Sequence, residues 1–514
     1  MWRVSSLVIL VVGAFLRLFD LGLVPLHHDE GVNGNFLVTL VRTGQYTYNP
    51  ENYHGPTLYF FSAVIPWMAR FFGGKAFGDN WGLTTFNIRF VTAAFGIGTI
   101  WLALLLRKRL GTIGALSAAG LIAISPGAVY LSRYFIHESL FVFFTLGIVV
   151  AALKYYDTGQ PAYLILASIS AALMVATKET WIINGPVLLI ALIITGAYFS
   201  MREQVAGTNE GTLGERWQQT IERLGGGVPL ATIALMAFAV FVLVNVLFYS
   251  SFFTNYPKGV SDAMKTLNLW RQRTQEHYHP PYQYLYWLLQ EEALVVILGG
   301  IGALIAVVWA KNRLALFLAL WSFGLLAGYS LVGYKTPWIG LNFIVPLALV
   351  SGYTLEVAYQ KIREFGQSWL VFALMVLITT ACGYQMYQLN FVHYDDDAYP
   401  YVYAHTRREL LQMLNEIERT TKRMGTGTDT GIALVSPDYW PLPWYFRDYK
   451  KVGYYQDIVA TNEPIIIGSL AQEEKLKETY GDRYVRVDSG KDEGAYALRP
   501  GVDLLLYVRK DVAK

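Results

Sequence analysis

Cysteine and charge are both scarce in this 514-residue sequence. It has a single cysteine, Cys382, so no intramolecular disulfide can form and every part must be held by packing. Charged residues make up 15% of the chain and hydrophobic residues 54%, whereas a soluble domain has roughly a quarter charged residues. The net charge of +3 is small and dispersed, and no phosphate-binding glycine loop or tandem repeat is present. These absences exclude a water-soluble globule and argue against a nucleic-acid partner.

The few charges are distributed unevenly along the chain. Residues 390–514 contain 17 Lys and Arg and 20 Asp and Glu, whereas the first 389 residues contain only 24 and 18. The sequence therefore predicts a membrane domain over residues 1–389, with outer loops at 24–87 and 250–291, followed by a soluble domain over 390–514.

Apolar runs close to the roughly 20 residues that cross a bilayer occur eleven times in the membrane domain. They cover residues 5–23, 88–106, 113–132, 138–153, 162–177, 180–199, 229–249, 293–310, 314–333, 337–356 and 368–387. In the first run, Arg17 and Asp20 stand where a signal peptide would have its small-residue cleavage site, so we expect a retained helix. The predicted fold is mainly α: a polytopic bundle of about 11 transmembrane helices with a C-terminal soluble α/β domain.

The orientation follows from the basic loops. Residues 57–72 contain Pro66, Arg70 and many aromatic residues, which favours an interfacial helix over a span. With that helix left out and the N-terminus cytoplasmic, the basic loops all fall on the cytoplasmic side. These loops are residues 107–109, 311–313, 361–363 and the segment with Arg202, Arg216 and Arg223. We therefore expect a multi-pass cell-membrane protein whose C-terminal domain is extracytoplasmic.

Histidines follow the same division. All eight fall on the expected outer side, at positions 27, 28, 54, 137, 277, 279, 393 and 405. Chemistry on the outer face would explain this grouping. An equally simple explanation is that histidine is uncommon inside apolar spans.

The soluble tail has the pattern of a small α/β domain. Amphipathic or apolar periodicity predicts helices over 405–423 and 471–480 and strands over 431–435, 464–467 and 502–508.

The first outer loop carries two adjacent acids, Asp29 and Glu30, after His27 and His28. Two carboxylates just beyond a membrane helix can supply a general base and a second acceptor or metal ligand. The alternative is structural: Asp29 caps a helix over 31–42, because an acid near a helix N-terminus is favourable.

Charged residues also mark the corners between spans. Arg133, His137 and Glu138 lie on one turn, and Lys178 and Lys335 lie on two others. Such cations can hold a lipid phosphate, and Glu138 can help to bind a metal or position a base. The alternative is that these residues are snorkelling or interfacial anchors. Arg17 and Arg89, near the outer ends of their spans, are further candidates for orienting the acids.

The combined pattern resembles the GT-C glycosyltransferases, nearest to the protein O-mannosyltransferases and lipid A aminoarabinose transferases. It consists of Asp29-Glu30, His54-Gly55-Pro56 before an aromatic helix, Asn87-Ile88-Arg89, Tyr130 and Arg133 followed by Glu138, and Thr177-Lys178. The first two motifs are similar to those of a prokaryotic group described as flippase-associated and linked to archaeal glycosylation. The match covers mainly residues 10–185.

This resemblance implies a hexosyltransferase that passes a sugar from a polyprenyl-phosphate donor to a glycan, protein or lipid acceptor on the outer face, inverting the anomeric centre. Asp29 would be the base, supported by Glu30 and Glu138, and a divalent cation such as Mg²⁺ or Mn²⁺ could be held by Asp29 and Glu138. By the resemblance, Arg133 and Lys178 would bind the donor phosphate, and His54 stands where relatives often have a basic residue. Their places in the sequence add Lys335 as a further phosphate ligand and His28, His137, Arg17 and Arg89 as supporting residues.

Two alternatives from other classes stay open. One is a component of lipid-linked glycan translocation, which predicts charges lining a path through the spans. The other is a non-catalytic membrane scaffold whose tail docks partners. The charges gather at one face with few in mid-span, which weighs against a continuous path.

Overall fold

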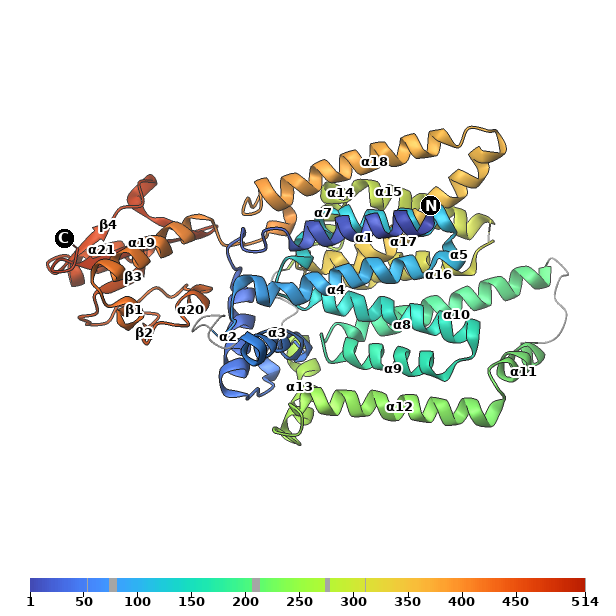
Figure 1. Ribbon diagram of the computed structural model, residues 1–514, viewed down its shortest axis with the longest axis horizontal. Coiled ribbons are helices and arrows are strands. Elements are labelled where there is room, and N and C mark those ends of the chain that lie inside the picture. Colours follow the sequence, from blue (N-terminus) through green and yellow to red (C-terminus); the bar gives the residue numbers. More distant parts are fainter. Residues whose placement is uncertain (53, 74–80, 206–212, 273–277, 310, 514) are drawn as a thin grey trace. The chain divides into compact units, whose positions relative to one another are not determined.

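The computed structural model describes residues 1–514 except 53, 74–80, 206–212, 273–277, 310 and 514 (Figure 1). His277 lies outside the described residues. The chain divides into two compact units. The first comprises Met1–Phe19, Gln45–Ser62 and Arg89–Val392, and the second comprises Asp20–Gly44, Ala63–Ile88 and His393–Lys514.

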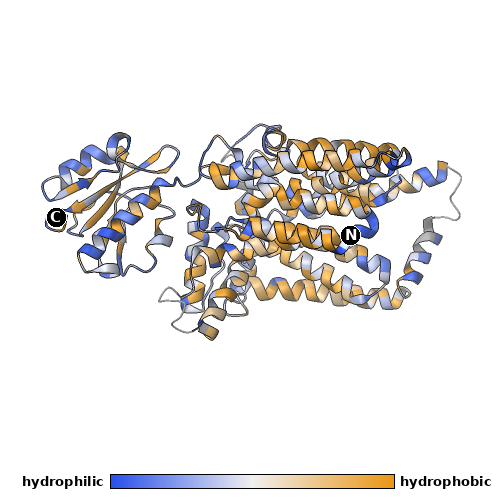
Figure 2. Cartoon of the chain, turned by 45° about the horizontal axis from the view of Figure 1, so that its top comes forward, coloured by the Kyte–Doolittle hydropathy of each residue, from blue (hydrophilic) through white to orange (hydrophobic). Residues whose placement is uncertain are grey.

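Unit 1 is a helix bundle whose long helices are apolar along almost their entire length (Figure 2). Two helices, α3 (Thr57–Gly73) and α4 (Thr85–Leu105), begin or end in unit 2. The others are α1 (Trp2–Leu18), α5 (Arg107–Leu110), α6 (Thr112–Ile124), α7 (Pro126–Ser132), α8 (Glu138–Thr158), α9 (Pro161–Val175), α10 (Trp181–Val205), α11 (Leu213–Arg223), α12 (Gly227–Tyr249), α13 (Lys258–Gln272), α14 (Gln283–Glu291), α15 (Ala293–Trp309), α16 (Arg313–Ser330), α17 (Leu341–Glu364) and α18 (Trp369–Tyr387).

The predicted membrane bundle is confirmed, with a smaller number of full-length spans. Among the described residues, seven helices are long and apolar enough to cross a bilayer, and nine if each of two bent pairs forms one span. These nine correspond to nine of the eleven expected runs. The other two, 5–23 and 162–177, form α1 and α9, which are 17 and 15 residues long and so fall short of about 20 residues.

Burial separates central from peripheral helices. In the span Pro337–Glu364, which contains α17, 94% of the apolar window is buried, whereas in α12 the figure is 6%. Small residues bring α17 close to α6: a Cβ on Gly352 would lie 2.3 Å from the Gly114 carbonyl oxygen and 2.8 Å from the Ala118 Cβ. Close helix contact at small residues is typical of membrane bundles.

Two broken helices meet inside the bundle. Helices α6 and α7 bend by 59° at Ser125, where Pro126 removes a backbone donor, and α14 and α15 bend by 113° at Glu292. The Ser125 hydroxyl caps α7 by accepting from the Ala128 N–H at 3.0 Å. It also donates to Glu292 Oε1 at 2.6 Å, and the Gly127 N–H donates to the same oxygen at 2.8 Å. The Glu292 carboxylate at the α14–α15 break therefore accepts hydrogen bonds from the start of α7, at the α6–α7 break.

The basic loops gather at one end of unit 1. Arg109 pairs with Asp157 near the C-terminus of α8, and Asn312 donates to the Arg109 carbonyl at 2.8 Å. Arg313 pairs with Glu203 at 2.5 Å. Helix α8 has 21 residues, so its first residue, Glu138, lies roughly 30 Å from this end. The structure thus groups the loops that the sequence predicted to share one membrane face.

Unit 2 contains α2 (His28–Thr43) and the C-terminal α/β fold. Its helices are α19 (Glu409–Arg423), α20 (Leu442–Tyr445) and α21 (Glu473–Tyr480). Its strands are β1 (Gly431–Leu434), β2 (Lys451–Tyr454), β3 (Ile465–Ser469), β4 (Tyr484–Val487), β5 (Tyr496–Arg499) and β6 (Val502–Arg509). The strand order is β2-β1-β3-β6-β4, with β5 also paired to β6. Strands β1, β2 and β3 are parallel, and β6 is antiparallel to β3, β4 and β5.

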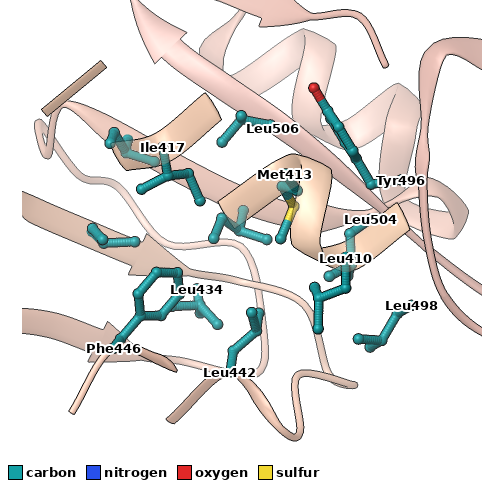
Figure 3. Close-up of a cluster of buried hydrophobic side chains, with 13 residues drawn as sticks. Leu410, Met413, Ile417, Leu434, Leu442, Phe446, Tyr496, Leu498, Leu504 and Leu506 are labelled. Atoms are coloured by element: carbon teal, nitrogen blue, oxygen red, sulfur yellow. The ribbon is translucent and has the colours of Figure 1, made fainter. Parts of the chain in front are cut away.

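The sheet is covered on both faces. Leu410, Met413 and Ile417, spaced by three and four residues, place one face of α19 against Leu434 and Leu506 (Figure 3). The alternate strand residues Ala433, Ile466 and Leu505 face the other way, against Leu476 and Tyr480 of α21. The predicted tail helices and strands therefore form, and their apolar residues make the domain core.

Candidate active site

A short extended segment joins the His-Gly-Pro motif to the corner between α9 and α10. His54 pairs with Lys178 in an isolated antiparallel bridge, and the Gly55 N–H donates to the Thr177 carbonyl at 2.9 Å. A Cβ on Gly55 would lie 2.0 Å from the Ala176 carbonyl oxygen, so no residue with a side chain fits there without a shift. The glycine of the motif is therefore required for this close backbone contact.

The corner holds a buried ion pair. The Lys178 ammonium donates to the Glu138 carboxylate, and both residues are buried. Glu138 is the first residue of α8, where its negative charge is favourable at the helix N-terminus. Two of the predicted site residues, 40 positions apart in the chain, are thus brought into direct contact.

A second carboxylate orients His54. His54 Nδ1 lies 2.9 Å from Glu179 Oε2, and the His54 side chain is 32% exposed, which makes it the accessible part of this pair. Burial acts to raise the pKa of Glu179, but nearby His54, its hydrogen bond and Lys178 outweigh that effect and lower the pKa. Glu179 therefore stays ionised and fixes the imidazole, leaving Nε2 as the nitrogen that can contact a ligand.

His137 completes the cluster by supporting the motif. Its Nε2–H donates to the Gly55 carbonyl at 3.0 Å, and its ring centroid lies 4.8 Å from that of His54. Burial, followed by the nearby His54 and Lys178, holds the pKa of His137 well below its usual range. His137 is therefore neutral near pH 7, which matches its role as a support for the motif rather than as a cation.

The two arginines bind backbone carbonyls near helix ends. Arg133 donates to the Leu16 carbonyl at 3.1 Å and the Phe19 carbonyl at 2.5 Å, at the end of α1. Arg17 is fully buried and donates to carbonyls at the α6–α7 break, those of Ile122 at 2.8 Å and Ala123 at 3.0 Å. These carbonyls lack the partners that a continuous helix would provide, so Arg17 stabilises the break.

The remaining predicted cations of unit 1 are also buried. Lys335 donates to the Ser330 carbonyl at 3.2 Å and to the Val332 carbonyl, and its ammonium lies 5.8 Å from the Tyr284 ring centroid. Burial lowers the pKa of Lys335. Arg89 is 2% exposed, in the part of α4 that belongs to unit 1.

In unit 2, the adjacent acids of the first loop have different surroundings. His27 caps α2: its Nδ1 accepts from the Asp29 N–H at 3.0 Å, while the Glu30 carboxylate accepts from the His27 N–H at 3.0 Å. This reciprocal capping box uses the fully buried Glu30 for structure. The Asp29 side chain is 42% exposed. The cap is therefore His27 rather than Asp29, and Asp29 is the accessible acid.

Helix α2 is held by the C-terminal fold of the same unit. The Leu26 N–H donates to the Tyr445 hydroxyl at 2.9 Å, and Arg42 pairs with Asp448 at 2.5 Å. Gly34 allows close approach, because a Cβ there would lie 2.7 Å from the Trp444 ring. Asp29 is thus presented by a helix that packs on residues 440–448.

The described residues do not offer a ready-made metal centre. No group of three or more His, Cys, Asp or Glu side chains among them is arranged to hold an ion. Of the two acids considered for a divalent cation, Glu138 is already engaged by Lys178, which does not fit a metal ligand.

Unit 1 therefore brings together Glu138, Lys178, His54 and His137, and unit 2 places Asp29 and Glu30 at one capped helix start. Sequence reasoning missed Glu179. Its position next to Lys178 in the same corner was the available signal, but its partner, His54, lies 125 residues away.

Comparison with known proteins agrees with this fold. Residues 62–207, less than half of the chain, match the family described as dolichyl-phosphate-mannose-protein mannosyltransferase. No curated protein matches the sequence. Among solved structures, the chain is similar to ArnT from Cupriavidus metallidurans bound to undecaprenyl phosphate, with a TM-score of 0.62 and 12% identity over 100% of this chain and 99% of ArnT.

A second similar structure is the Archaeoglobus fulgidus oligosaccharyltransferase in complex with Zn and sulfate. The TM-score is 0.53 and the identity 14%, over 91% of this chain and 68% of the oligosaccharyltransferase. At these identities the similarity concerns the fold. The predicted architecture, a membrane helix bundle followed by a small C-terminal sheet domain, is confirmed, and the fold is similar to that of ArnT.

Proposed function

We propose that this protein is an integral-membrane glycosyltransferase that transfers a sugar from a polyprenyl-phosphate donor to an acceptor hydroxyl on the extracytoplasmic face. The observation that carries the proposal is the cluster of Glu138, Lys178, His54 and Glu179 at one end of a bundle with the ArnT fold. The N-terminus is cytoplasmic in this proposal, so that the cluster and the C-terminal domain face outward.

Two comparisons support the type of donor. The structure of ArnT with this fold holds undecaprenyl phosphate, and the family that matches residues 62–207 is named for a dolichyl-phosphate-mannose donor. Both are sugar carriers in which a polyprenyl chain is linked through phosphate. Such a phosphate is already a leaving group, so the enzyme must mainly deprotonate the acceptor and stabilise the departing charge.

Asp29 acts as the general base in this proposal. It is the exposed member of the acid pair, whereas Glu30 is buried in the capping box. An exposed carboxylate can reach a substrate hydroxyl and accept its proton. Glu30 supports Asp29 by fixing the start of α2, and His28 stands beside it in the sequence.

Lys178, Arg133 and His54 bind the donor phosphate. The Lys178 ammonium has three N–H donors and gives one to Glu138, so donors remain for phosphate oxygens. His54 is oriented by Glu179 and presents its other ring nitrogen. Lys335 adds positive charge at the corner between α16 and α17. Glu138 positions Lys178 rather than acting on the substrate.

The proposed reaction balances with these groups alone. The acceptor O–H bond breaks, its proton goes to Asp29, and the oxygen forms a bond to the anomeric carbon of the donor sugar. The bond between that carbon and the phosphate oxygen breaks at the same time, and its electron pair leaves with the polyprenyl phosphate. Attack opposite the leaving group inverts the anomeric centre.

An Asp29→Asn variant tests the proposal. With polyprenyl-phosphate sugars as donors, we expect the transfer rate to fall by about 10²- to 10⁴-fold, the usual contribution of a general base, while donor affinity is kept. Asp396→Asn is the matched control, because the Asp396 side chain is similarly exposed, at 41%, in the same unit. An undiminished rate in Asp29→Asn, or translocation of the lipid-linked glycan without bond formation, contradicts the proposal.

A further inference from the structure

Four aromatic side chains form a row on unit 2, and we call His28, Tyr439, Trp440 and Tyr454 the aromatic row. The ring centroids of His28 and Trp440 are 6.1 Å apart, those of Trp440 and Tyr439 are 5.9 Å apart, and those of Tyr439 and Tyr454 are 5.3 Å apart. Tyr439 and Trp440 are half-buried, and Tyr454 is 37% exposed. The rings therefore keep accessible surface while they support one another.

The row lies at a place where open α/β sheets commonly bind ligands. Strands β1 and β2 are parallel, and Tyr439 and Trp440 follow the carboxyl end of β1 while Tyr454 ends β2. Ligands of such sheets bind outside the carboxyl ends of the parallel strands, where the following loops converge.

Charged groups border the row. Asp438, whose side chain is 49% exposed, pairs with Arg499, and Arg499 also donates to the Trp440 carbonyl at 3.4 Å. Asp29 follows His28 directly, and a Cβ on Gly31 would lie 2.6 Å from the Pro441 Cβ and 3.2 Å from the Trp440 ring. The helix that carries Asp29 therefore packs at its first turn against the loop that holds Trp440.

This combination of groups matches the chemistry of a sugar. One face of a pyranose ring presents C–H groups that pack on aromatic rings, while its hydroxyls bond to carboxylates and guanidinium groups at the edge. A binding site of this kind is mostly aromatic, with a few placed polar groups. The two exposed carboxylates, Asp29 and Asp438, would repel the negative charges of an anionic lipid surface.

We propose that the aromatic row is the acceptor-binding surface and that the acceptor is a glycan. This inference rests on the proposed function, because it assigns the hydroxyl that Asp29 deprotonates to a sugar unit stacked on Trp440 and Tyr439. The acceptor hydroxyl gives its proton to Asp29 and its oxygen bonds to the donor sugar, so the product is a glycan longer by one unit.

The first experiment measures binding without chemistry. The full-length protein in detergent is applied to arrays of immobilised neutral and acidic glycans and of Ser- and Thr-containing peptides. We expect the wild type to bind a set of glycans, Trp440→Ala to weaken that binding at least tenfold, and Trp440→Phe to restore most of it. Tyr454→Ala is a second variant, and it should also weaken binding.

Val485→Ala is the matched control, because Val485 is an exposed apolar residue on β4, at the opposite edge of the sheet. It should bind glycans as the wild type does. Three results overturn the proposal: no glycan binds the wild type, Trp440→Ala and Tyr454→Ala bind glycans as tightly as the wild type, or only peptides bind and the row variants abolish that binding.

The second experiment separates this inference from the proposed function. In transfer assays with a bound glycan as acceptor, Trp440→Ala and Tyr454→Ala should raise the acceptor KM with kcat nearly unchanged. Asp29→Asn should lower the transfer rate by about 10²- to 10⁴-fold and keep glycan binding. If Asp29→Asn transfers normally, the proposed function fails while the binding result stands. If transfer needs Asp29 but the acceptor KM of the row variants is unchanged, only the acceptor proposal fails.

Discussion

The Gly55 backbone lies against Ala176 so closely that a Cβ on Gly55 would be 2.0 Å from the Ala176 carbonyl oxygen. This contact is between two backbones, so neither side can yield by rotating a side chain. It fixes the His-Gly-Pro motif to the corner that carries Lys178 and Glu179 and thereby sets where His54 lies.

A Gly55→Ala variant should separate the two backbones. We expect a loss of about 1–3 kcal/mol, as for other overpacked interiors, together with loss of the His54–Glu179 contact. Thermal unfolding of the purified protein in detergent measures the change. Gly185→Ala is the control, because nothing lies within 4 Å of a Cβ at Gly185, and it should not lower stability. Equal behaviour of the two variants would contradict the close contact at Gly55.

The buried pair of Glu138 and Lys178 should behave as a unit. Removing one charge, in Glu138→Gln or Lys178→Met, leaves the other buried without its partner and should cost about 3–5 kcal/mol of unfolding free energy. The double variant Glu138→Gln with Lys178→Met should cost less than the sum of the single changes. Unfolding in a denaturing detergent series measures these values.

The exposed pair of Lys361 and Glu364, 3.6 Å apart, provides the comparison for that cycle. Its removal should change the free energy of unfolding by only about 0–1 kcal/mol. If the Glu138–Lys178 cycle gave a coupling as small as that of the exposed pair, the central role given to the buried pair would be wrong.

The pair of His54 and Glu179 should contribute to binding of the donor. His54→Ala removes a proposed phosphate ligand, and Glu179→Gln removes the negative charge that orients the ring. We expect both to raise the donor KM, by roughly tenfold for each 1.4 kcal/mol of lost binding, with a smaller effect on kcat. His393→Ala, which alters a histidine paired with Asp396 in unit 2, should leave the donor KM unchanged.

Stability should fall in mild acid. Burial, with neighbouring positive or histidine groups, holds the pKa of His27 and His137 well below the usual value, so the folded chain resists protonation that the unfolded chain accepts. Their contribution is complete above the unfolded pKa of about 6.5 and is lost as pH falls, by up to about 1.4 kcal/mol per pH unit for each histidine. Thermal unfolding between pH 8 and pH 5 measures this slope.

His137→Gln should flatten that pH dependence. Its amide nitrogen can still donate to the Gly55 carbonyl, but the side chain no longer titrates. A slope in His137→Gln as steep as in the wild type would show that His137 is not one of the groups that cause it.

The sequence was sufficient to predict those helices and strands that are determined by the pattern of neighbouring residues. Long apolar runs predicted the membrane helices, and periodic patterns predicted α19, α21, β1, β3 and β6. Strands β2, β4 and β5 were not predicted. Each has four residues, and β2 is a solvent-exposed edge strand that includes Gly453. Such segments become strands through pairing with β1 and β6, which no local pattern records.

The site was predicted as a set of residue types, and the pairing within it was not. The sequence indicated Glu138 and Lys178 as separate corner residues, but their contact depends on helix packing. The only local signal for Glu179 was its place beside Lys178, because its partner His54 is 125 residues away, and the capping box that occupies Glu30 depends on the conformation of His27. Partner choice between distant residues is decided by tertiary structure, so only the candidates could be derived.

The membership of α2 in the C-terminal unit bears on how this protein can be cut into parts. A fragment ending near residue 392 would discard Tyr445 and Asp448, which hold Leu26 and Arg42. The isolated tail, in turn, would lack α2 and so would expose the Trp444 ring, which packs against Gly34. Neither fragment is therefore a complete folding unit, and a stable soluble version of the tail should require residues 20–44 grafted back onto it.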